Sequence, residues 1–163
     1  MGFKLVLLHS EGEAEARREA DWPRRLRSAI PDIEIEVCRS VSGAMGPIVE
    51  ADAAFGDILP ELFDRAEKLR WIACPAAGPK AGYYHRALVE SGVVVTNTRA
   101  IYNDHIGAHI MSFVLAFARG LHVYIPQQAE RRWRPGYDTI HLPETTAVVV
   151  GAGGIGGEAA RLC

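Results

Sequence analysis

The residues with the clearest chemical potential are glycines near the end of the chain. Gly151, Gly153 and Gly156 form the pattern G-x-G-x-x-G. In this pattern the first glycine allows a tight turn, the second lets a pyrophosphate approach bare backbone, and the third lets a helix pack closely on a strand. Free N–H groups at the start of the following helix, together with the helix dipole, attract phosphate charge. The spacing predicts a dinucleotide site, with an ordinary glycine-rich turn as the alternative.

The segments on either side of these glycines fit a strand–turn–helix unit. Residues 148–150 are three valines, which is typical of a parallel strand covered on both faces, and residues 158–162 can begin a helix. This context favours the dinucleotide interpretation over a plain turn. A βαβ unit needs about 30 residues, whereas the chain stops at Cys163. The sequence therefore predicts the front part of a longer protein.

Two earlier segments contain residues that could bind an acid. Residues 75–80, PAAGPK, follow an expected strand, and their small side chains leave backbone N–H groups uncovered. Such a turn can form a nest for a carboxylate, and a plain turn is equally compatible with its composition. Asn97 follows the next expected strand and could offer its amide to a carboxylate, or serve as a turn or cap residue. In open α/β sheets ligands bind beyond the carboxyl ends of the strands, so both segments are candidates.

The first hundred residues alternate strand and helix signals. A helical composition covers residues 13–30, with a break or fresh start at Pro23, and a second helix begins at Pro60 with an apolar stripe that extends to Leu69. A short helix is expected over residues 83–90. The expected strands are residues 3–8, 32–37, 51–55, 71–74 and 93–95, of which 32–37 has the alternation of a strand near a sheet edge. This order predicts a doubly wound parallel sheet.

Residues 103–129 form the longest helical stretch. Its apolar side chains lie nearly all round the expected helix, which predicts burial on several sides. Such a helix would serve as a joint between two domains and as a candidate subunit contact. Pro126 is expected to end or kink it, because proline lacks the N–H that a helix interior requires.

Composition narrows the possible partners. The net charge of −2 gives no electrostatic footprint for nucleic acid or an anionic membrane, so neither is expected. Arg131, Arg132 and Arg134 form a basic cluster that a solvated helix end explains better than a binding patch. Three cysteines without short pair spacing argue against a disulfide framework or a zinc site and favour a cytoplasmic location. The nearly apolar run at residues 110–118 is too short to span a bilayer, which requires about 20 residues.

The histidines do not predict a metal site. His105 and His109 are four residues apart on one expected helix face, a spacing that metal sites also use. Zinc requires at least three protein ligands, and no third ligand is placed to join them. A role on the helix surface or at an interface is preferred.

The order of these motifs resembles that of the D-isomer-specific 2-hydroxyacid dehydrogenases. The resemblance covers about residues 60–163, and the first fifty residues are similar only in architecture. The segments that carry it are residues 69–72, 77–78, 94–98, 101–102, 113–119, 127–133 and 148–156. It implies a flavodoxin-like doubly wound α/β substrate domain over residues 1–98. Residues 99–163 would be a hinge helix and the first βα unit of an incomplete Rossmann NAD(P)-binding domain.

The resemblance also implies a function. The protein would be an oxidoreductase that interconverts a D-2-hydroxy acid and its 2-keto acid with NAD or NADP, homodimeric at full length. The substrate carboxylate would meet the backbone amides of Ala77 and Gly78, with Asn97 close by. The cofactor would lie on a turn formed by Gly151, Gly153, Gly154, Ile155 and Gly156.

The residues that perform the family's acid–base chemistry are expected elsewhere. The catalytic arginine, carboxylate and histidine of the family would lie beyond Cys163, so we assign no catalytic residue within this chain and expect no turnover from it alone. An NAD(H)-sensing binding protein or corepressor of the same architecture, without turnover, is the alternative.

Overall fold

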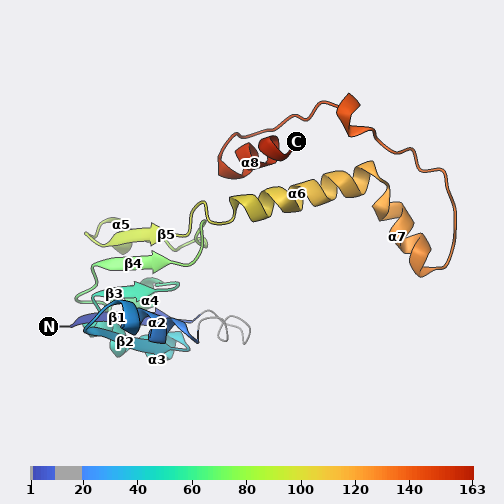
Figure 1. Cartoon of the computed structure of the whole chain (residues 1–163). Coiled ribbons are helices and arrows are strands. Elements are labelled where there is room, and N and C mark those ends of the chain that lie inside the picture. The colour runs from blue at the N-terminus through green and yellow to red at the C-terminus, as the bar shows by residue number, and fades with distance from the viewer. Residues whose placement is uncertain (1, 10–19) are drawn as a thin grey trace. The chain divides into compact units, whose positions relative to one another are not determined.

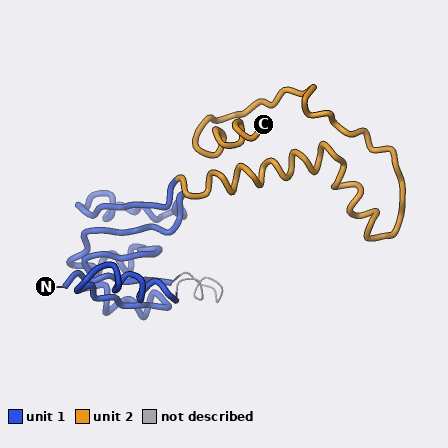
Figure 2. Tube along the Cα trace, in the orientation of Figure 1, with its two compact units in different colours: residues 1–99 blue, residues 100–163 orange. Residues whose placement is uncertain are grey.

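A computed structural model describes residues 2–9 and 20–163 of the chain. It divides into two compact units, Met1–Arg99 and Ala100–Cys163, which are coloured separately in Figure 2. We call them unit 1 and unit 2 and describe each by itself.

Unit 1 is built on one parallel sheet (Figure 1). Its five strands have the order β2-β1-β3-β4-β5, and every neighbouring pair is parallel. The strands are β1 Phe3–Leu8, β2 Ile33–Cys38, β3 Ala53–Phe55, β4 Trp71–Cys74 and β5 Val94–Asn97. The predicted doubly wound parallel α/β sheet is therefore confirmed. The predicted edge position of β2 is confirmed as well, since among the described residues this strand pairs only with β1.

The helices that the structure describes in unit 1 are short. They are α2 Trp22–Ala29, α3 Val41–Ala44, the 3₁₀ helix η1 Pro47–Glu50, α4 Pro60–Phe63 and α5 Arg86–Val89. Pro23 lies in the first turn of α2, as expected for a fresh start, whereas residues 10–19 of the predicted helix lie outside the described residues.

Two helix lengths differ from the prediction. Helix α4 begins at Pro60 as predicted but ends at Phe63, because the N–H groups of Arg65 and Ala66 bond three residues back and tighten the turn. Leu69 is buried all the same, from the segment before β4. Helix α5 begins later than residue 83, because His85 occupies its N-cap and Nδ1 accepts a hydrogen bond from the Leu88 N–H at 3.3 Å.

Apolar side chains cover both faces of the sheet. The side chains of β1 alternate between the two layers, which explains why this strand is almost entirely apolar. The larger layer includes Val6, Leu8, Ile48, Ile58, Leu62, Ile72, Cys74 and Tyr83. The smaller layer consists of Leu5, Leu7, Ile33, Ile35 and Ala53, with Leu26 of α2 packed against it.

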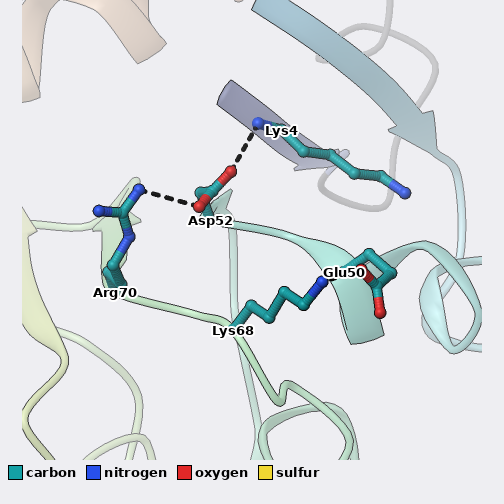
Figure 3. Close-up of polar contacts among 5 residues, drawn as sticks. All are labelled: Lys4, Glu50, Asp52, Lys68 and Arg70. Atoms are coloured by element: carbon teal, nitrogen blue, oxygen red, sulfur yellow. Dashed lines mark hydrogen bonds and ion pairs between the residues drawn. The ribbon is translucent and has the colours of Figure 1, made fainter. Parts of the chain in front are cut away.

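Charged groups join the amino ends of three strands (Figure 3). The Asp52 carboxylate accepts one hydrogen bond from the Lys4 backbone N–H and one from the Arg70 guanidinium, each at 2.9 Å. The Lys4 N–H, with the Arg70 guanidinium as a further contribution, holds the pKa of Asp52 below its ordinary value of 3.8. An exposed ion pair between Lys68 and Glu50 lies nearby. Asp52 thus ties β1, β3 and β4 together at this end of the sheet.

Unit 2 consists of helices and connecting segments. Its elements are α6 Asn103–Ala118, α7 Leu121–Ala129, the 3₁₀ helix η2 Leu142–Glu144 and α8 Gly154–Leu162. Helices α6 and α8 pack closely at Gly107, where an added Cβ would lie 2.7 Å from the Glu158 side chain. A small residue is therefore required at this crossing.

The prediction of a single helix over residues 103–129 is wrong in one respect. The stretch is divided into α6 and α7, which meet at a bend of 74°. The break lies at Gly120, which has a left-handed φ of 71°, and not at Pro126, which lies inside α7. Tyr137 stabilises this corner: its ring contacts Gly120, and its hydroxyl donates to the Phe117 carbonyl oxygen at 3.2 Å. An added Cβ at Gly120 would collide with the Tyr137 ring.

The predicted strand at residues 148–150 is absent. These residues belong to no strand and make no backbone hydrogen bond within the described residues, and Val148 and Val150 are 83% and 96% exposed. A strand requires a neighbour to accept and donate its backbone hydrogen bonds, and residues 100–163 contain no other strand. The prediction that the long helix is buried on several sides is also wrong. Phe113 and Phe117 are about half exposed, because too few elements of unit 2 pack against this helix to cover them.

Helix length and hydropathy show whether any helix could span a membrane. Within the described residues no single helix is long and apolar enough to cross a membrane. Helices α6 and α7 meet that criterion only when taken together, by length and composition alone, and they are bent at their junction.

Candidate functional site

The loops that follow β4 and β5 lie side by side and are joined by hydrogen bonds. The Asn97 side-chain amide donates to the Ala77 carbonyl oxygen at 2.9 Å, and Thr98 Oγ1 donates to the Pro75 carbonyl oxygen at 2.9 Å. Asn97 Oδ1 also accepts from the Arg99 N–H at 3.3 Å. The structure thus brings the predicted residues Ala77 and Asn97 together at the carboxyl edge of the sheet. We call residues 75–82 the small-residue loop.

Main-chain donors are accessible in the small-residue loop. Ala77 and Gly78 are exposed, and their N–H groups donate to no acceptor within the described residues. An added Cβ on Gly78 would meet nothing within 4 Å. Adjacent uncovered N–H groups can accept an anion, and hydrogen bonds to a charged acceptor are stronger than those between neutral groups. Asn97 is already engaged in bracing the loop, and its second amide hydrogen is the part that could reach a ligand.

A buried tyrosine anchors the far end of this loop. Tyr83 is completely buried and belongs to the larger core layer together with Cys74. Burial raises the pKa of the Tyr83 hydroxyl, and the neighbouring Cys74 thiol adds to this effect. Tyr83 therefore remains neutral. The sequence analysis placed it in a short helix over residues 83–90 and did not predict its burial.

The same edge contains an ion pair that sequence reasoning did not single out. Asp57 follows β3, and its Oδ2 lies 3.0 Å from Lys80 Nζ in the small-residue loop. The Gly56 N–H donates to the Ala73 carbonyl oxygen at 3.2 Å, which extends the pairing of β3 and β4 up to Asp57. A lysine within a loop of small residues was the only sequence signal for this pair.

In unit 2 the glycine turn, residues 151–156, has the geometry that its spacing requires. Gly151 has a φ of 93°, which side-chain-bearing residues rarely adopt. An added Cβ on Gly156 would overlap the Gly151 carbonyl oxygen, so helix and turn approach as closely as glycine allows. Gly153 has open space where its Cβ would be, whereas a Cβ on Gly154 would collide with the Asn103 side chain.

The N-terminus of α8 presents free backbone donors. Gly153 is its N-cap and no side chain caps it. The first hydrogen bond of the helix runs from the Gly157 N–H to the Gly153 carbonyl oxygen at 2.7 Å. The N–H groups of Gly154, Ile155 and Gly156 have no acceptor in the described residues. With the positive end of the helix dipole, these three groups form a surface suited to a phosphate.

The remaining candidates do not add a metal site. Among the described residues, no three metal-ligating side chains lie together. His109 packs its ring against Phe113 with centroids 4.9 Å apart, and His105 lies beside Tyr102. Both histidines are exposed on α6.

Comparison with known proteins adds structural matches across the chain. No protein-family model matches the sequence. A D-isomer-specific 2-hydroxyacid dehydrogenase family protein from Aeromonas salmonicida matches 99% of this chain and 50% of its own, with a TM-score of 0.73 and 22% identity. An enzyme of the same description from Xanthobacter autotrophicus, in complex with NADPH and MES, matches 96% and 49%, with a TM-score of 0.70 and 25% identity.

A third match is the D-lactate dehydrogenase from Aquifex aeolicus, in complex with NAD and lactic acid. It covers 98% of this chain and 47% of its own, with a TM-score of 0.69 and 14% identity. The chain thus spans about half the length of the solved structures it matches. Its five-stranded sheet has the fold of the substrate-binding domain of D-isomer 2-hydroxyacid dehydrogenases.

Proposed function

We propose that this chain is the substrate-binding domain and the first nucleotide-binding segment of an NAD(P)-dependent D-2-hydroxyacid dehydrogenase. The reaction is the interconversion of a D-2-hydroxy acid and its 2-keto acid. One observation carries the proposal: the chain has two separate sets of uncovered backbone N–H groups, at residues 77–78 and 154–156. The structural matches to dehydrogenases over nearly the whole chain support it.

The acid binds at the small-residue loop of unit 1. Its carboxylate accepts hydrogen bonds from the Ala77 and Gly78 N–H groups. Each bond contributes about 1.5 kcal/mol, which is the lower end of the range for a charged acceptor, because the loop is exposed to solvent. Asn97 holds the loop in place through its bond to the Ala77 carbonyl oxygen. Because Asn97, Thr98 and Tyr83 fix this loop in advance, little ordering entropy is lost on binding.

The dinucleotide binds at the glycine turn of unit 2. The bare backbone at Gly153 leaves room for a pyrophosphate, and the N–H groups of Gly154 and Ile155 donate to it, while Gly151 and Gly156 keep the turn tight. When bound, a nicotinamide dinucleotide supplies hydride transfer to and from C2 of the acid. The matched Aquifex and Xanthobacter structures contain NAD and NADPH respectively, which supports either cofactor.

No acid or base is assigned within this chain. We infer from the family resemblance that the catalytic arginine, carboxylate and histidine would lie elsewhere in the full-length protein, and that this chain would supply binding and positioning. Turnover requires those groups from a longer, homodimeric cytoplasmic enzyme.

Nuclear magnetic resonance tests the two binding sites on the chain as it is. Amide proton–nitrogen spectra would be recorded during titration with pyruvate and, separately, with NADH. Pyruvate should shift the signals of Ala77 and Gly78, and NADH those of Gly154 and Ile155. Pyruvamide, which lacks the carboxylate charge, serves as the control and should leave Ala77 and Gly78 unchanged. If neither set of signals responds to its ligand, the proposal is wrong.

Activity of the chain alone is the second measurement. Mixed with NADH and a panel of 2-keto acids, it should leave the near-ultraviolet absorbance of the reduced cofactor constant. A decrease would show that catalytic groups lie within these 163 residues. Binding at both turns, with no turnover by any longer form of the protein, would instead favour the NAD(H)-sensing alternative.

A further inference from the structure

An amide side chain lies against the glycine turn of unit 2, and the proposed function does not use it. It belongs to Asn103, the first residue of α6. A Cβ built on Gly154 would collide with the Asn103 amide nitrogen and would lie 2.9 Å from its oxygen. Since Cβ is bonded directly to Cα, the amide contacts the bare backbone of Gly154. Helix α6 thus brings a polar side chain to the start of α8.

The Asn103 amide is not engaged elsewhere. Within residues 2–9 and 20–163 neither its nitrogen nor its oxygen forms a hydrogen bond, although the residue is only partly exposed. An asparagine side chain offers two N–H donors and one acceptor oxygen. A ligand can therefore accept a hydrogen bond from this amide without displacing another group of the described chain.

Asn103 is also not required as a cap of α6. The N-cap residue is Tyr102, and the neighbouring Asp104 accepts a hydrogen bond from the His105 N–H through Oδ1 at 2.8 Å. The Asp104 carboxylate lies in the first turn of α6, where a negative charge is favourable because of the helix dipole. This helix end is thus already supplied with an anion, and its amide side chain is the group left for a ligand.

A second carboxylate near the crossing of α6 and α8 is paired. Arg161 Nη2 lies 2.6 Å from Glu158 Oε1. The hydrogen bond from Arg161 holds the pKa of Glu158 below its ordinary value of 4.5, while the nearby Asp104 charge acts in the opposite direction. Arg161 offsets the charge of Glu158, so Asp104 is the carboxylate that opposes an anion here.

We propose that Asn103 donates a hydrogen bond to one phosphate of a diphosphate whose other phosphate lies on α8, so that this turn prefers nucleoside diphosphates to monophosphates. The inference rests on the proposed function, which places a pyrophosphate at the glycine turn. The free N–H groups of residues 154–156 belong to the end of one helix and together serve one phosphate. The Asn103 amide lies beside them, and a charged acceptor strengthens its hydrogen bond. A monophosphate occupies the helix end alone and gains nothing from Asn103.

Two nucleotides that differ by one phosphate test this preference. The full chain is titrated with ADP and with AMP at low ionic strength, while the amide signals of Gly154 and Ile155 are followed. The unaltered chain should bind ADP more tightly. Asn103→Ala should weaken the binding of ADP about fivefold, equivalent to one exposed hydrogen bond to a charged acceptor, and should leave that of AMP unchanged.

Asn103→Asp separates binding from a structural role. Aspartate has nearly the shape of asparagine, but it replaces the donor with a negative charge that repels a phosphate. The affinity for ADP should fall about tenfold. The thermal unfolding temperature should stay equal or rise, because a carboxylate in the first turn stabilises α6. A merely structural role for Asn103 would instead make affinity and thermal stability fall together, which would overturn the inference.

Gln128→Glu is the matched control. Gln128 is an exposed amide on α7, and this substitution changes the net charge by the same amount as Asn103→Asp. The two positions are separated by the length of α6, whose 16 residues span about 24 Å. Gln128→Glu should keep the preference for ADP. An equal loss in both variants would mean that overall charge causes the effect, and the inference would be overturned.

The remaining outcomes distinguish the inference from the proposed function. If Asn103→Ala binds ADP as tightly as the unaltered chain, or loses ADP and AMP equally, Asn103 does not bind the second phosphate, and the glycine turn remains a phosphate site. If neither ADP nor NADH moves the signals of Gly154 and Ile155, the proposed cofactor site is itself wrong, and the inference fails with it.

Discussion

The small-residue loop of unit 1 and the glycine turn of unit 2 both expose backbone N–H groups, but they are held in different ways. The loop is fixed by side chains from the neighbouring strand, through Asn97 and Thr98, and by the buried Tyr83. The glycine turn follows the unpaired residues 148–150 and depends on its own backbone geometry. A parallel sheet therefore fixes its loops through adjacent strands, whereas a turn without a paired strand relies on its glycines alone.

The largest expected effect comes from adding a methyl group inside the glycine turn. Gly156→Ala places a Cβ against the Gly151 carbonyl oxygen, and overpacking of this kind costs up to about 3 kcal/mol. Binding of NADH, followed by the amide signals of residues 154–155, should fall by about two orders of magnitude.

Gly157→Ala is the control for this substitution. An added Cβ at Gly157 meets nothing within 4 Å, and alanine is the better helix former, so α8 should become slightly more stable and retain its affinity for NADH. If Gly156→Ala bound NADH as tightly as Gly157→Ala, the close approach of turn and helix would not matter for the site.

A smaller effect is expected at the amino ends of the unit 1 strands. Asp52→Asn removes the charge that Lys4 and Arg70 stabilise, and the free energy of unfolding at neutral pH should fall by about 1 kcal/mol, after allowance for solvent screening. Chemical denaturation measures this change. Glu50→Gln, which affects only the exposed pair with Lys68, should change stability by less than about 0.5 kcal/mol.

The effect of Asp52 should also depend on pH. Because the folded-state pKa of Asp52 is below its ordinary value of 3.8, its contribution is fully present above that value and is lost as pH falls through the lower folded-state pKa. The difference between the unaltered chain and Asp52→Asn should therefore shrink in acid below about pH 4. A constant difference across this range would contradict the assignment.

The smallest effect tests the bracing of the small-residue loop. Asn97→Ala removes the bond to the Ala77 carbonyl oxygen, and the affinity for pyruvate should fall about threefold, equivalent to one neutral, exposed hydrogen bond. Titration of the Ala77 and Gly78 amide signals measures it. Thr96→Val is the control, because within the described residues the Thr96 hydroxyl accepts a hydrogen bond only from the Trp71 indole N–H, and loss of this bond should leave pyruvate binding unchanged.

Local patterns predicted much of unit 1. The apolar run of β1, the alternation in β2 and the proline at the start of α4 are features of consecutive residues, and all three appear in the structure. The candidate residues Ala77 and Asn97 could be found from strand ends alone, since parallel strands bring successive carboxyl ends to one edge.

Features that depend on distant residues could not be predicted. The bend at Gly120 is stabilised by Tyr137, and the ion pair of Lys80 joins a residue from the end of another strand. Pro126 was expected to end or kink the long helix, but α7 continues through it to Ala129. The strand at residues 148–150 was predicted from its valines, and composition alone does not supply a partner strand.

Residues 148–150 also affect how the chain behaves in concentrated solution. Their main-chain donors and acceptors are unpaired, and two of their three valine side chains are almost entirely in water. Such a segment acts as a template to which an extended stretch of another molecule can add by hydrogen bonding, the route by which edge strands start aggregation. The same backbone that leads into the glycine turn is thus a candidate starting point for self-association.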